Sequence, residues 1–126
     1  MKKNYVSWIE VRQYIDKLSN ILSFRPFTGV YGIPKGGCVL AVMLSYKMNI
    51  PLLAAPCNGC IIIDDIADTG KTLLHYKEKS GCFITTMFYH KQSSVVPNFW
   101  YKEKKDNWIV YPWEEEEHES IRHNML

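Results

Sequence analysis

Residues 60–74 read CIIIDDIADTGKTLL, and this stretch decides the fold. The apolar run 60–63 is dominated by β-branched isoleucine, which is typical of a strand buried on both faces of a parallel sheet. We expect the strand to end where two adjacent carboxylates, Asp64 and Asp65, begin. Two leucines at positions 73 and 74 then head a helix. The stretch therefore predicts a strand, a polar turn and a helix.

The polar turn is suited to binding a phosphate. Asp68 or Thr69 can cap the following helix, and Gly70 lets the backbone turn with a positive φ, so that several N–H groups and two hydroxyls converge. Such a point binds a phosphate. The two carboxylates before the turn are suited to the vicinal hydroxyls of a ribose, or to a magnesium ion beside it. Phosphate and ribose together suggest a sugar phosphate.

Gly70-Lys71-Thr72 also looks like the end of a P-loop. That loop needs a first glycine five positions before Gly70, and position 65 is Asp. The spacing therefore excludes an ATP-binding loop of this kind.

Residues 60–72 resemble the phosphoribosyl-pyrophosphate motif of the type I phosphoribosyltransferases, an apolar strand followed by two acids, a short spacer and Thr-Gly-x-Thr. The resemblance implies that Asp64 and Asp65 hold the ribose hydroxyls and order a magnesium ion. It also implies a main-chain cradle for the 5′-phosphate, formed by Asp68, Thr69, Gly70, Lys71 and Thr72.

Length and composition indicate one globular domain over residues 1–126, with 47% hydrophobic and 22% charged residues. The 15 basic and 13 acidic residues give a net charge of +2, which argues against a nucleic-acid partner. No apolar run approaches the roughly 20 residues that span a membrane, so we expect no membrane partner and a cytoplasmic location, with four reduced cysteines. Residues 57–60 form a CxxC, but no paired histidines complete a zinc site, and we interpret it as coincidence.

The first half of the chain predicts alternating strands and helices. A capping box at Ser7 starts a helix over residues 7–22. A strand over residues 28–33 and a helix over residues 39–48 follow. Strand, helix, strand and helix in this order imply a parallel sheet with right-handed crossovers, whose ligands gather at the carboxyl ends of the strands. The fold class is therefore α/β, a parallel sheet with flanking helices.

The turn Pro34-Lys35-Gly36-Gly37 is a second candidate anion site, because its backbone N–H groups can approach a ligand closely. Alone, a Gly-Gly turn is more often only a tight connection. In the type I phosphoribosyltransferases a Lys- or Arg-Gly-Gly turn at this place holds the pyrophosphate. The resemblance thus implies that role for Lys35, Gly36 and Gly37, and a cis peptide bond at Pro34-Lys35.

Residues 50–55 should form the next strand, but only residues 56–59 separate it from the strand at Cys60. Similar enzymes place a long mobile loop here that folds over the site, and it is missing. At about 3.3 Å per residue and 4.8 Å between strands, four residues cannot run back along the sheet and cross a neighbouring strand. We favour a shortened edge strand over a hairpin at Asn58-Gly59 with a different sheet order.

Beyond the central motif, a helix over residues 70–79 and a strand over residues 82–89 are expected. His90 and Lys91 lie at the carboxyl end of that strand. In purine-specific relatives a lysine near this place contacts the oxygen on the six-membered ring, and Lys91 matches in type while His90 is the alternative in register. Both could instead belong to a solvated strand end.

Residues 106–114 carry a second resemblance, to the terminal strand of xanthine-guanine-type purine phosphoribosyltransferases, in which Asp-x-Trp precedes Pro-Trp-acid. It implies a small base-binding hood over about residues 97–114, in which Trp108 stacks on the purine and Ile109 contacts it through the main chain. All of these apolar residues could instead be core, and we favour core for Trp113. Residues 97–105 are interpreted as a polar connection, and residues 115–126 as a solvated acidic tail.

The resemblance implies a purine phosphoribosyltransferase that transfers 5-phosphoribosyl from phosphoribosyl pyrophosphate to a 6-oxopurine, with Asp68 as general base at the purine N7 and Mg²⁺ as cofactor. As in its relatives, a homodimer or homotetramer is expected. The alternative is a regulatory module that binds phosphoribosyl pyrophosphate or a nucleotide but has lost transfer together with the loop. A pyrimidine-specific enzyme is disfavoured by the segment from Trp108 to Trp113.

Overall fold

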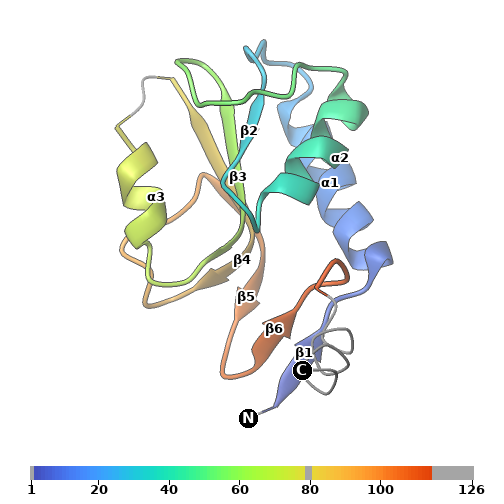
Figure 1. Ribbon diagram of the computed structural model, residues 1–126, viewed down its shortest axis with the longest axis vertical. Coiled ribbons are helices and arrows are strands. Elements are labelled where there is room, and N and C mark those ends of the chain that lie inside the picture. Colours follow the sequence, from blue (N-terminus) through green and yellow to red (C-terminus); the bar gives the residue numbers. More distant parts are fainter. Residues whose placement is uncertain (1, 79–80, 115–126) are drawn as a thin grey trace, which may run out of the picture.

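The computed structural model describes residues 2–78 and 81–114. Four parallel strands form the central sheet in the order β2, β3, β4 and β5, so that each new strand is added on the same side (Figure 1). This confirms the predicted α/β class with a parallel sheet. The strands are β2 Val30–Gly32, β3 Ile61–Ala67, β4 Phe83–His90 and β5 Phe99–Lys104.

Helices cover both faces of the sheet (Figure 1). Helices α1, Trp8–Leu22, and α2, Cys38–Met48, lie on one face, and the short α3, Lys71–Tyr76, lies on the other. The hydroxyl of Ser7 accepts a hydrogen bond from the Glu10 N–H at 3.1 Å, so α1 begins at the predicted cap.

The isoleucines of β3 alternate between two hydrophobic cores. Ile61 and Ile63 belong to the core beneath α1 and α2, whereas Ile62 belongs to the core beneath α3, and all three are fully buried. Within the larger core the Tyr14 hydroxyl shares a 2.7 Å hydrogen bond with the Thr85 hydroxyl, which ties α1 to β4. The apolar run of β3 is therefore a strand buried on both sides, as its composition predicts.

The expectation that this strand stops at the first carboxylate is wrong. β3 continues to Ala67, because β4 is long enough to keep pairing with it: Asp64 lies opposite Thr86, and Ala67 opposite Tyr89. On its other side β2 pairs only as far as Ile63. The two acids therefore lie inside the strand, at the point where one neighbour has ended and the other has not.

Residues 50–55 do not form a full strand. A single parallel bridge joins Leu52 to Val30, with hydrogen bonds of 2.9 Å from the Val30 N–H to the Pro51 carbonyl and 2.8 Å from the Leu53 N–H to the Val30 carbonyl. It lies on the edge of β2 that faces away from β3. The favoured shortened edge strand is thus confirmed, in a form reduced to one residue pair.

Residues 97–105 are not merely a connection, because β5 occupies most of them. Phe99 and Tyr101 lie on one face of the strand and pack on Tyr14 of α1, with ring centroids 6.3 Å and 5.8 Å away. The outward Trp100 stacks on Tyr89 of β4 at 5.1 Å. FWYKEK places three aromatic residues before three charged ones, so it lacks the apolar-polar alternation that marks a half-buried strand.

A second, two-stranded parallel sheet joins the two ends of the described chain. Strand β1, Lys3–Tyr5, pairs with β6, Trp108–Val110. β6 is the predicted terminal strand, shortened to three residues, whereas sequence analysis missed β1. β1 has only three residues, KNY, and therefore contains no apolar run from which a strand could be predicted.

The remaining elements differ from expectation mainly at their ends. β2 covers three of the residues predicted over 28–33, and β4 begins and ends one residue later than predicted. Helix α3 ends at Tyr76, earlier than expected; Lys79, like the acidic tail over residues 115–126, lies outside the described residues. The peptide bond Pro34-Lys35 is cis, as the resemblance implies.

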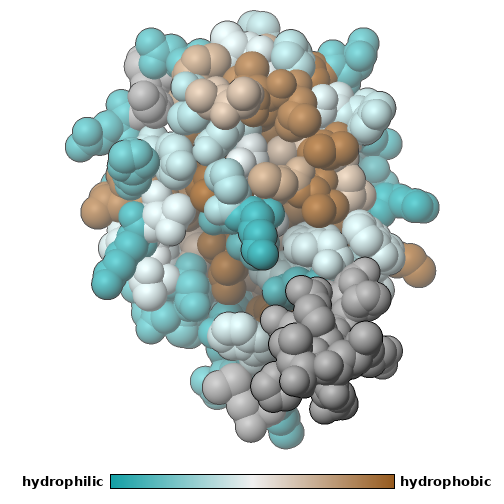
Figure 2. Space-filling view, viewed as in Figure 1, coloured by the Kyte–Doolittle hydropathy of each residue, from teal (hydrophilic) through white to brown (hydrophobic). Residues whose placement is uncertain are grey.

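The cysteines and the helix surfaces add two observations. Cys57 and Cys60 form no disulfide, although the Cys60 and Cys82 sulfurs lie 3.7 Å apart. No helix among the described residues is long and apolar enough to cross a membrane. Helix α2 nevertheless has apolar residues on its outer side, with Val42 40% and Tyr46 85% exposed, and Figure 2 shows apolar side chains gathered where Figure 1 draws this helix.

Candidate active site

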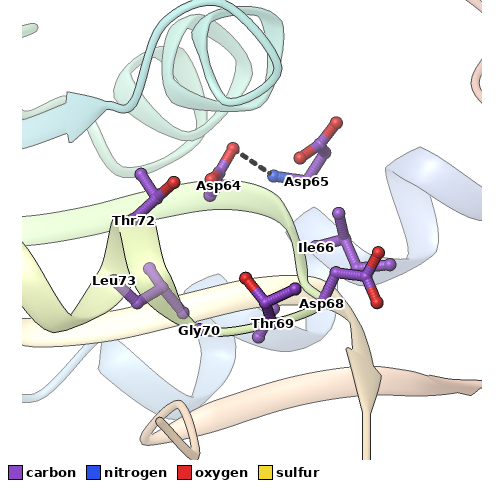
Figure 3. Close-up of a pocket in the computed structure, with 9 residues that line it drawn as sticks. Asp64, Asp65, Ile66, Asp68, Thr69, Gly70, Thr72 and Leu73 are labelled. Atoms are coloured by element: carbon purple, nitrogen blue, oxygen red, sulfur yellow. Dashed lines mark hydrogen bonds between the residues drawn. The ribbon is translucent and has the colours of Figure 1, made fainter. Parts of the chain in front are cut away.

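A polar cavity of about 180 Å³ opens at the carboxyl end of β3 (Figure 3). It is lined by residues 64–70, 72 and 73, so the strand end, the turn and the start of α3 all contribute to it. Parallel α/β sheets bind their ligands at this end of their strands. The cavity therefore lies where the sequence motif predicts the site.

The two acids at the rim of the cavity are largely buried and close together. Asp64 is 9% exposed, and its Oδ1 accepts a 2.8 Å hydrogen bond from the Asp65 N–H. Burial, followed by the neighbouring charge of Asp65, raises the pKa of Asp64, and burial raises the pKa of Asp65 as well. Neither carboxylate forms an ion pair with the described residues. The pair is thus a concentration of negative charge that a cation or hydroxyl donors would stabilise.

The turn after the acids is fixed against the segment that follows β4. Gly70 has φ +87°, and a side chain there would meet the Ser94 hydroxyl at 2.6 Å, so only glycine fits. The Ser94 N–H donates to the Thr69 carbonyl at 2.9 Å, and the Thr69 hydroxyl accepts from the Lys71 N–H at 3.3 Å. The predicted phosphate cradle is therefore held from two sides.

The glycine turn predicted to bind pyrophosphate lies directly beside the acids. A Cβ atom at Gly36 would collide with the Asp65 carboxylate, and one at Gly37 would collide with the Ile63 carbonyl. The Ile33 N–H, just before this turn, donates to the Ile63 carbonyl at 3.0 Å. The fold thus brings the two turns predicted to bind anions, which are distant in sequence, close to one pair of carboxylates. Lys35 is exposed at the edge of this turn.

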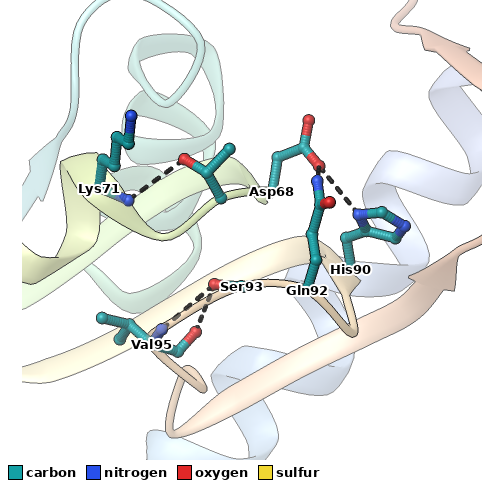
Figure 4. A network of polar contacts seen from close by, with 7 residues as sticks. Asp68, Lys71, His90, Gln92, Ser93 and Val95 are labelled. Carbon is teal, nitrogen blue, oxygen red and sulfur yellow. Dashed lines mark hydrogen bonds and ion pairs between the residues drawn. The ribbon is translucent and has the colours of Figure 1, made fainter.

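Asp68 also lines the cavity, and two side chains from the end of β4 contact it (Figure 4). His90 Nδ1 lies 3.1 Å from Asp68 Oδ1, and the Gln92 side-chain amide donates to the same oxygen at 2.9 Å. Lys91, between them in sequence, points elsewhere: its side chain is 81% exposed and forms a 3.7 Å ion pair with Glu103. Of the two residues predicted at this strand end, only His90 contacts a residue of the cavity.

β6 brings the predicted base-binding residues to the same end of the molecule. The Trp108 N–H donates to Lys2, and Val110 accepts from Val6. Alternate residues of a parallel strand bond to the same neighbour, so the main-chain groups of Ile109 face the opposite, open edge of β6. Trp108 is 53% exposed, whereas Ile109 is 7% exposed.

Tyr111 connects this strand to the acids. Its hydroxyl donates to the Asp65 carbonyl at 3.1 Å, and its ring stacks on Trp113 with centroids 4.9 Å apart. Trp113 also packs at the margin of the large core, which agrees with the core role favoured for it. The segment predicted to bind the base is therefore joined to the main chain of Asp65 by the Tyr111 hydroxyl.

Comparison with known proteins supports the same reading. No protein-family model matches the chain. A xanthine-guanine phosphoribosyltransferase of Nitratidesulfovibrio vulgaris is 26% identical over 88% of this chain and 84% of its own length. The crystal structure of a purine phosphoribosyltransferase from Pyrococcus horikoshii is 29% identical, with a TM-score of 0.80 over 91% of this chain and 95% of that one. Sequence and fold together support a type I phosphoribosyltransferase.

A more distant structure shows how far the fold is shared. The xanthine-guanine-hypoxanthine phosphoribosyltransferase of Helicobacter pylori is 13% identical, with a TM-score of 0.75 over 96% of this chain and 97% of that one. The shortened connection over residues 56–59 is therefore compatible with the type I phosphoribosyltransferase fold.

Several residues that surround the site of this phosphoribosyltransferase were missed by sequence analysis. Tyr111, Gln92 and Ser94 contact Asp65, Asp68 and Thr69 respectively. Gln92 and Ser94 belong to no recognisable motif, and Gln92 is marked only by its position two residues after a strand end already assigned to the site. Tyr111 lies within the segment 106–114, but the motif gives it no role of its own.

Proposed function

We propose that this phosphoribosyltransferase transfers the 5-phosphoribosyl group of phosphoribosyl pyrophosphate to a 6-oxopurine. The products are a nucleoside monophosphate and pyrophosphate. One observation carries the proposal: the paired acids in the last part of β3 lie between the turn predicted to bind the 5′-phosphate and a glycine turn that touches Asp65. A ribose with a phosphate at one end and a pyrophosphate at the other fits such an arrangement. The names of the purine-specific relatives support the class of base.

Each part of the substrate has a proposed partner. Asp64 and Asp65 accept hydrogen bonds from the ribose hydroxyls. The turn over residues 68–72 donates its N–H groups to the 5′-phosphate, and the turn of Lys35, Gly36 and Gly37 donates to the pyrophosphate. Because these groups are fixed by the sheet, they hold the sugar in one orientation before the reaction begins.

The reaction exchanges one bond for another at the anomeric carbon of the ribose. A purine nitrogen forms a bond to this carbon. The bond between the carbon and the pyrophosphate oxygen breaks, and its electron pair leaves with pyrophosphate. Asp68 accepts the proton that the base loses at N7. Its place in the wall of the cavity supports this role.

Magnesium is the proposed cofactor, and the donor set fits it. Carboxylate oxygens are the ligands that Mg²⁺ prefers. Burial, followed by the neighbouring charge of Asp65, raises the pKa of Asp64, and a bound cation would offset both effects. No group of three metal-ligating side chains occurs among residues 2–78 and 81–114, so Asp64 and Asp65 would hold the ion together with substrate oxygens and water. When bound, Mg²⁺ neutralises charge on the leaving pyrophosphate.

The base is proposed to stack on Trp108 and to be read by main-chain groups of Ile109 at the open edge of β6. Both features support this assignment, since the indole is half-exposed and the edge is unpaired by β1. Lys91 is proposed to contact the oxygen of the six-membered ring. Its side chain is 81% exposed and forms, among the described residues, a 3.7 Å ion pair with Glu103 that a ligand could replace.

A homo-oligomer is proposed for the working enzyme, supported by the apolar outer side of α2. Val42 and Tyr46 leave apolar surface exposed on this helix, which subunit contact would bury. Tyr46→Lys should therefore lower the mass measured by light scattering, and an unchanged mass would place the contact elsewhere. We also propose a cytoplasmic location, where the four free cysteines stay reduced.

The experiment that tests the function is pyrophosphate release with Mg²⁺, phosphoribosyl pyrophosphate and, separately, guanine, xanthine, hypoxanthine and adenine. Release with one or more 6-oxopurines and not with adenine is expected. Calorimetric titration with the same ligands should accompany it. Binding of phosphoribosyl pyrophosphate without release would instead support the regulatory module, because the loop that covers the site in similar enzymes is missing here.

A further inference from the structure

We propose that His90 and Gln92 are positioning residues that orient the Asp68 carboxylate for its reaction with the purine. The proposal rests on the proposed function, in which Asp68 accepts a proton from the base. It differs from the expectation that His90 itself reads the edge of the purine. In the structure the imidazole is turned to Asp68 instead.

Both donors converge on one oxygen of Asp68 (Figure 4). His90 Nδ1 and Gln92 Nε2 lie 3.1 Å and 2.9 Å from Oδ1, whereas Oδ2 has no hydrogen-bond partner among the described residues. Figure 4 shows this second oxygen pointing away from both donors. One oxygen is thus used to hold the carboxylate, and the other is left to meet a ligand proton.

Without these contacts the carboxylate would have little to fix its rotation. Its side chain is 41% exposed and lies in a turn rather than in a strand or helix. A freely rotating carboxylate would present either oxygen, at changing angles, to the base. Two hydrogen bonds to one oxygen select one orientation, and such preorganisation lowers the barrier to proton transfer.

The contact also fixes the protonation pattern of the imidazole. An ionised carboxylate only accepts hydrogen bonds, so Nδ1 of His90 must carry the proton in this contact. In the neutral ring, Nε2 is then the unprotonated nitrogen. This arrangement can be measured directly, without reference to turnover.

The fold holds the two donors in place by anchoring the segment on which they lie. Ala67 pairs with Tyr89, so His90 ends β4 beside the turn that carries Asp68. The Ser93 N–H donates to the His90 carbonyl at 2.9 Å, which closes a tight turn around Gln92. The following Ser94 N–H bonds to Thr69. The donors and their acceptor therefore lie on two segments that are bonded to each other.

The kinetic test uses a conservative and a disruptive variant of each donor. His90→Asn keeps an N–H near the position of Nδ1 and should retain most of the turnover, whereas His90→Leu should lower kcat about tenfold to a hundredfold with the KM for phosphoribosyl pyrophosphate unchanged. Gln92→Ala should lower kcat about tenfold. His75→Ala and Gln13→Ala, two exposed positions outside the site, serve as matched controls and should leave both constants unchanged.

Different results would overturn the proposal in recognisable ways. Equal loss in His90→Asn and His90→Leu would show that the imidazole is needed for more than its donor, as a proton acceptor would be. A rise confined to the KM for the purine would make His90 a contact of the base. Turnover unchanged in His90→Leu and in Gln92→Ala would show that the orientation of Asp68 does not limit the reaction.

Nuclear magnetic resonance of the His90 ring nitrogens decides the contact independently of activity. We expect the tautomer protonated at Nδ1 in the wild-type protein, and a changed signal in Asp68→Asn. The tautomer protonated at Nε2 would overturn the proposal. A wild-type protein that releases no pyrophosphate with any purine would instead overturn the proposed function and, with it, the catalytic consequence, while the ring signals would still report whether the contact exists.

Discussion

The carboxyl end of β3 and the strand β6 are built in opposite ways, although the proposed reaction needs both. At the end of β3, the acids and the phosphate turn come from one continuous stretch, and neighbouring segments bond to it on both sides. β6 has three residues and one paired strand, and the hydroxyl of Tyr111, directly after it, reaches Asp65. The part proposed to bind the sugar phosphate is thus local and rigid, whereas the part proposed to bind the base is assembled from distant segments.

The largest expected effect is at the rigid end. Asp68→Asn should lower kcat about a thousandfold with little change in the affinity for phosphoribosyl pyrophosphate, because an amide cannot accept the proton while the turn keeps its shape. Steady-state kinetics and calorimetric titration of the same variant provide the comparison. Turnover equal to that of the wild type would remove Asp68 from the role of general base.

The second prediction concerns the stability of this rigid end. The pKa of Asp64 is raised in the folded protein, so the folded state holds this proton more tightly than the unfolded chain does. The contribution of Asp64 to the free energy of unfolding is fully present below the usual pKa range of an aspartate. It is lost as the pH rises through the raised pKa. Asp64→Asn removes that loss and should stabilise the ligand-free, magnesium-free protein by about 2 kcal/mol near pH 8, with a smaller difference near pH 5.

Thermal unfolding at the two pH values measures this difference. The exposed Asp106→Asn is the matched control, since it removes the same charge without burial. Equal shifts of Tm for Asp64→Asn at both pH values would show that burial does not hold the proton. The same variant should have lost activity, so that stability and function are opposed at this position.

At the base-binding end a smaller effect, confined to one substrate, is expected. Trp108→Ala should raise the KM for the purine about tenfold and leave the affinity for phosphoribosyl pyrophosphate unchanged, because stacking on an aromatic ring contributes about 1 to 3 kcal/mol per base. The half-exposed indole supports a role in binding rather than in the core. Equal loss for both substrates would make Trp108 a residue needed for folding.

The smallest effect tests the connection between the two regions. Tyr111→Phe removes the hydrogen bond to the Asp65 carbonyl but keeps the stack on Trp113, and should cost about 1 kcal/mol. We expect the KM for the purine to rise a few-fold, since β6 loses its link to the sugar site. A change in phosphoribosyl pyrophosphate affinity alone would mean that the hydroxyl serves the acids instead of the strand.

The difference between the regions also explains what the sequence could predict. The motif of residues 60–72 carries its own strand and turn, so the place of the cavity was predicted correctly. The glycine turn of residues 34–37 was also predicted to lie near it, and Gly36 lies against Asp65. Gln92 and Tyr111 reach the site only through the fold, and no local pattern predicts their contacts with Asp68 and Asp65. The ligand roles of all these residues stay predictions.

The strand errors have a similar cause. β5 depends on Phe99 and Tyr101 packing on Tyr14, more than 80 positions earlier, and its charges resemble those of a loop. Lys102 of this strand reaches Glu10 of α1 at 3.0 Å, so even a charge that suggested solvent is part of the packing. The carboxylates within β3 misled in the same direction, because polar side chains were taken to end a strand that its neighbour in fact prolongs.

The pairing of β1 with β6 has a consequence for hydrogen exchange. Two three-residue strands from opposite ends of the chain protect each other's amides, and neither has another partner strand in the described structure. Local opening of this pair needs no disruption of the main sheet, so amides bonded between Lys3–Tyr5 and Trp108–Val110 should exchange sooner than those of β3. A bound purine would slow exchange in both segments together, which makes the first strand of the chain a reporter of events at the last.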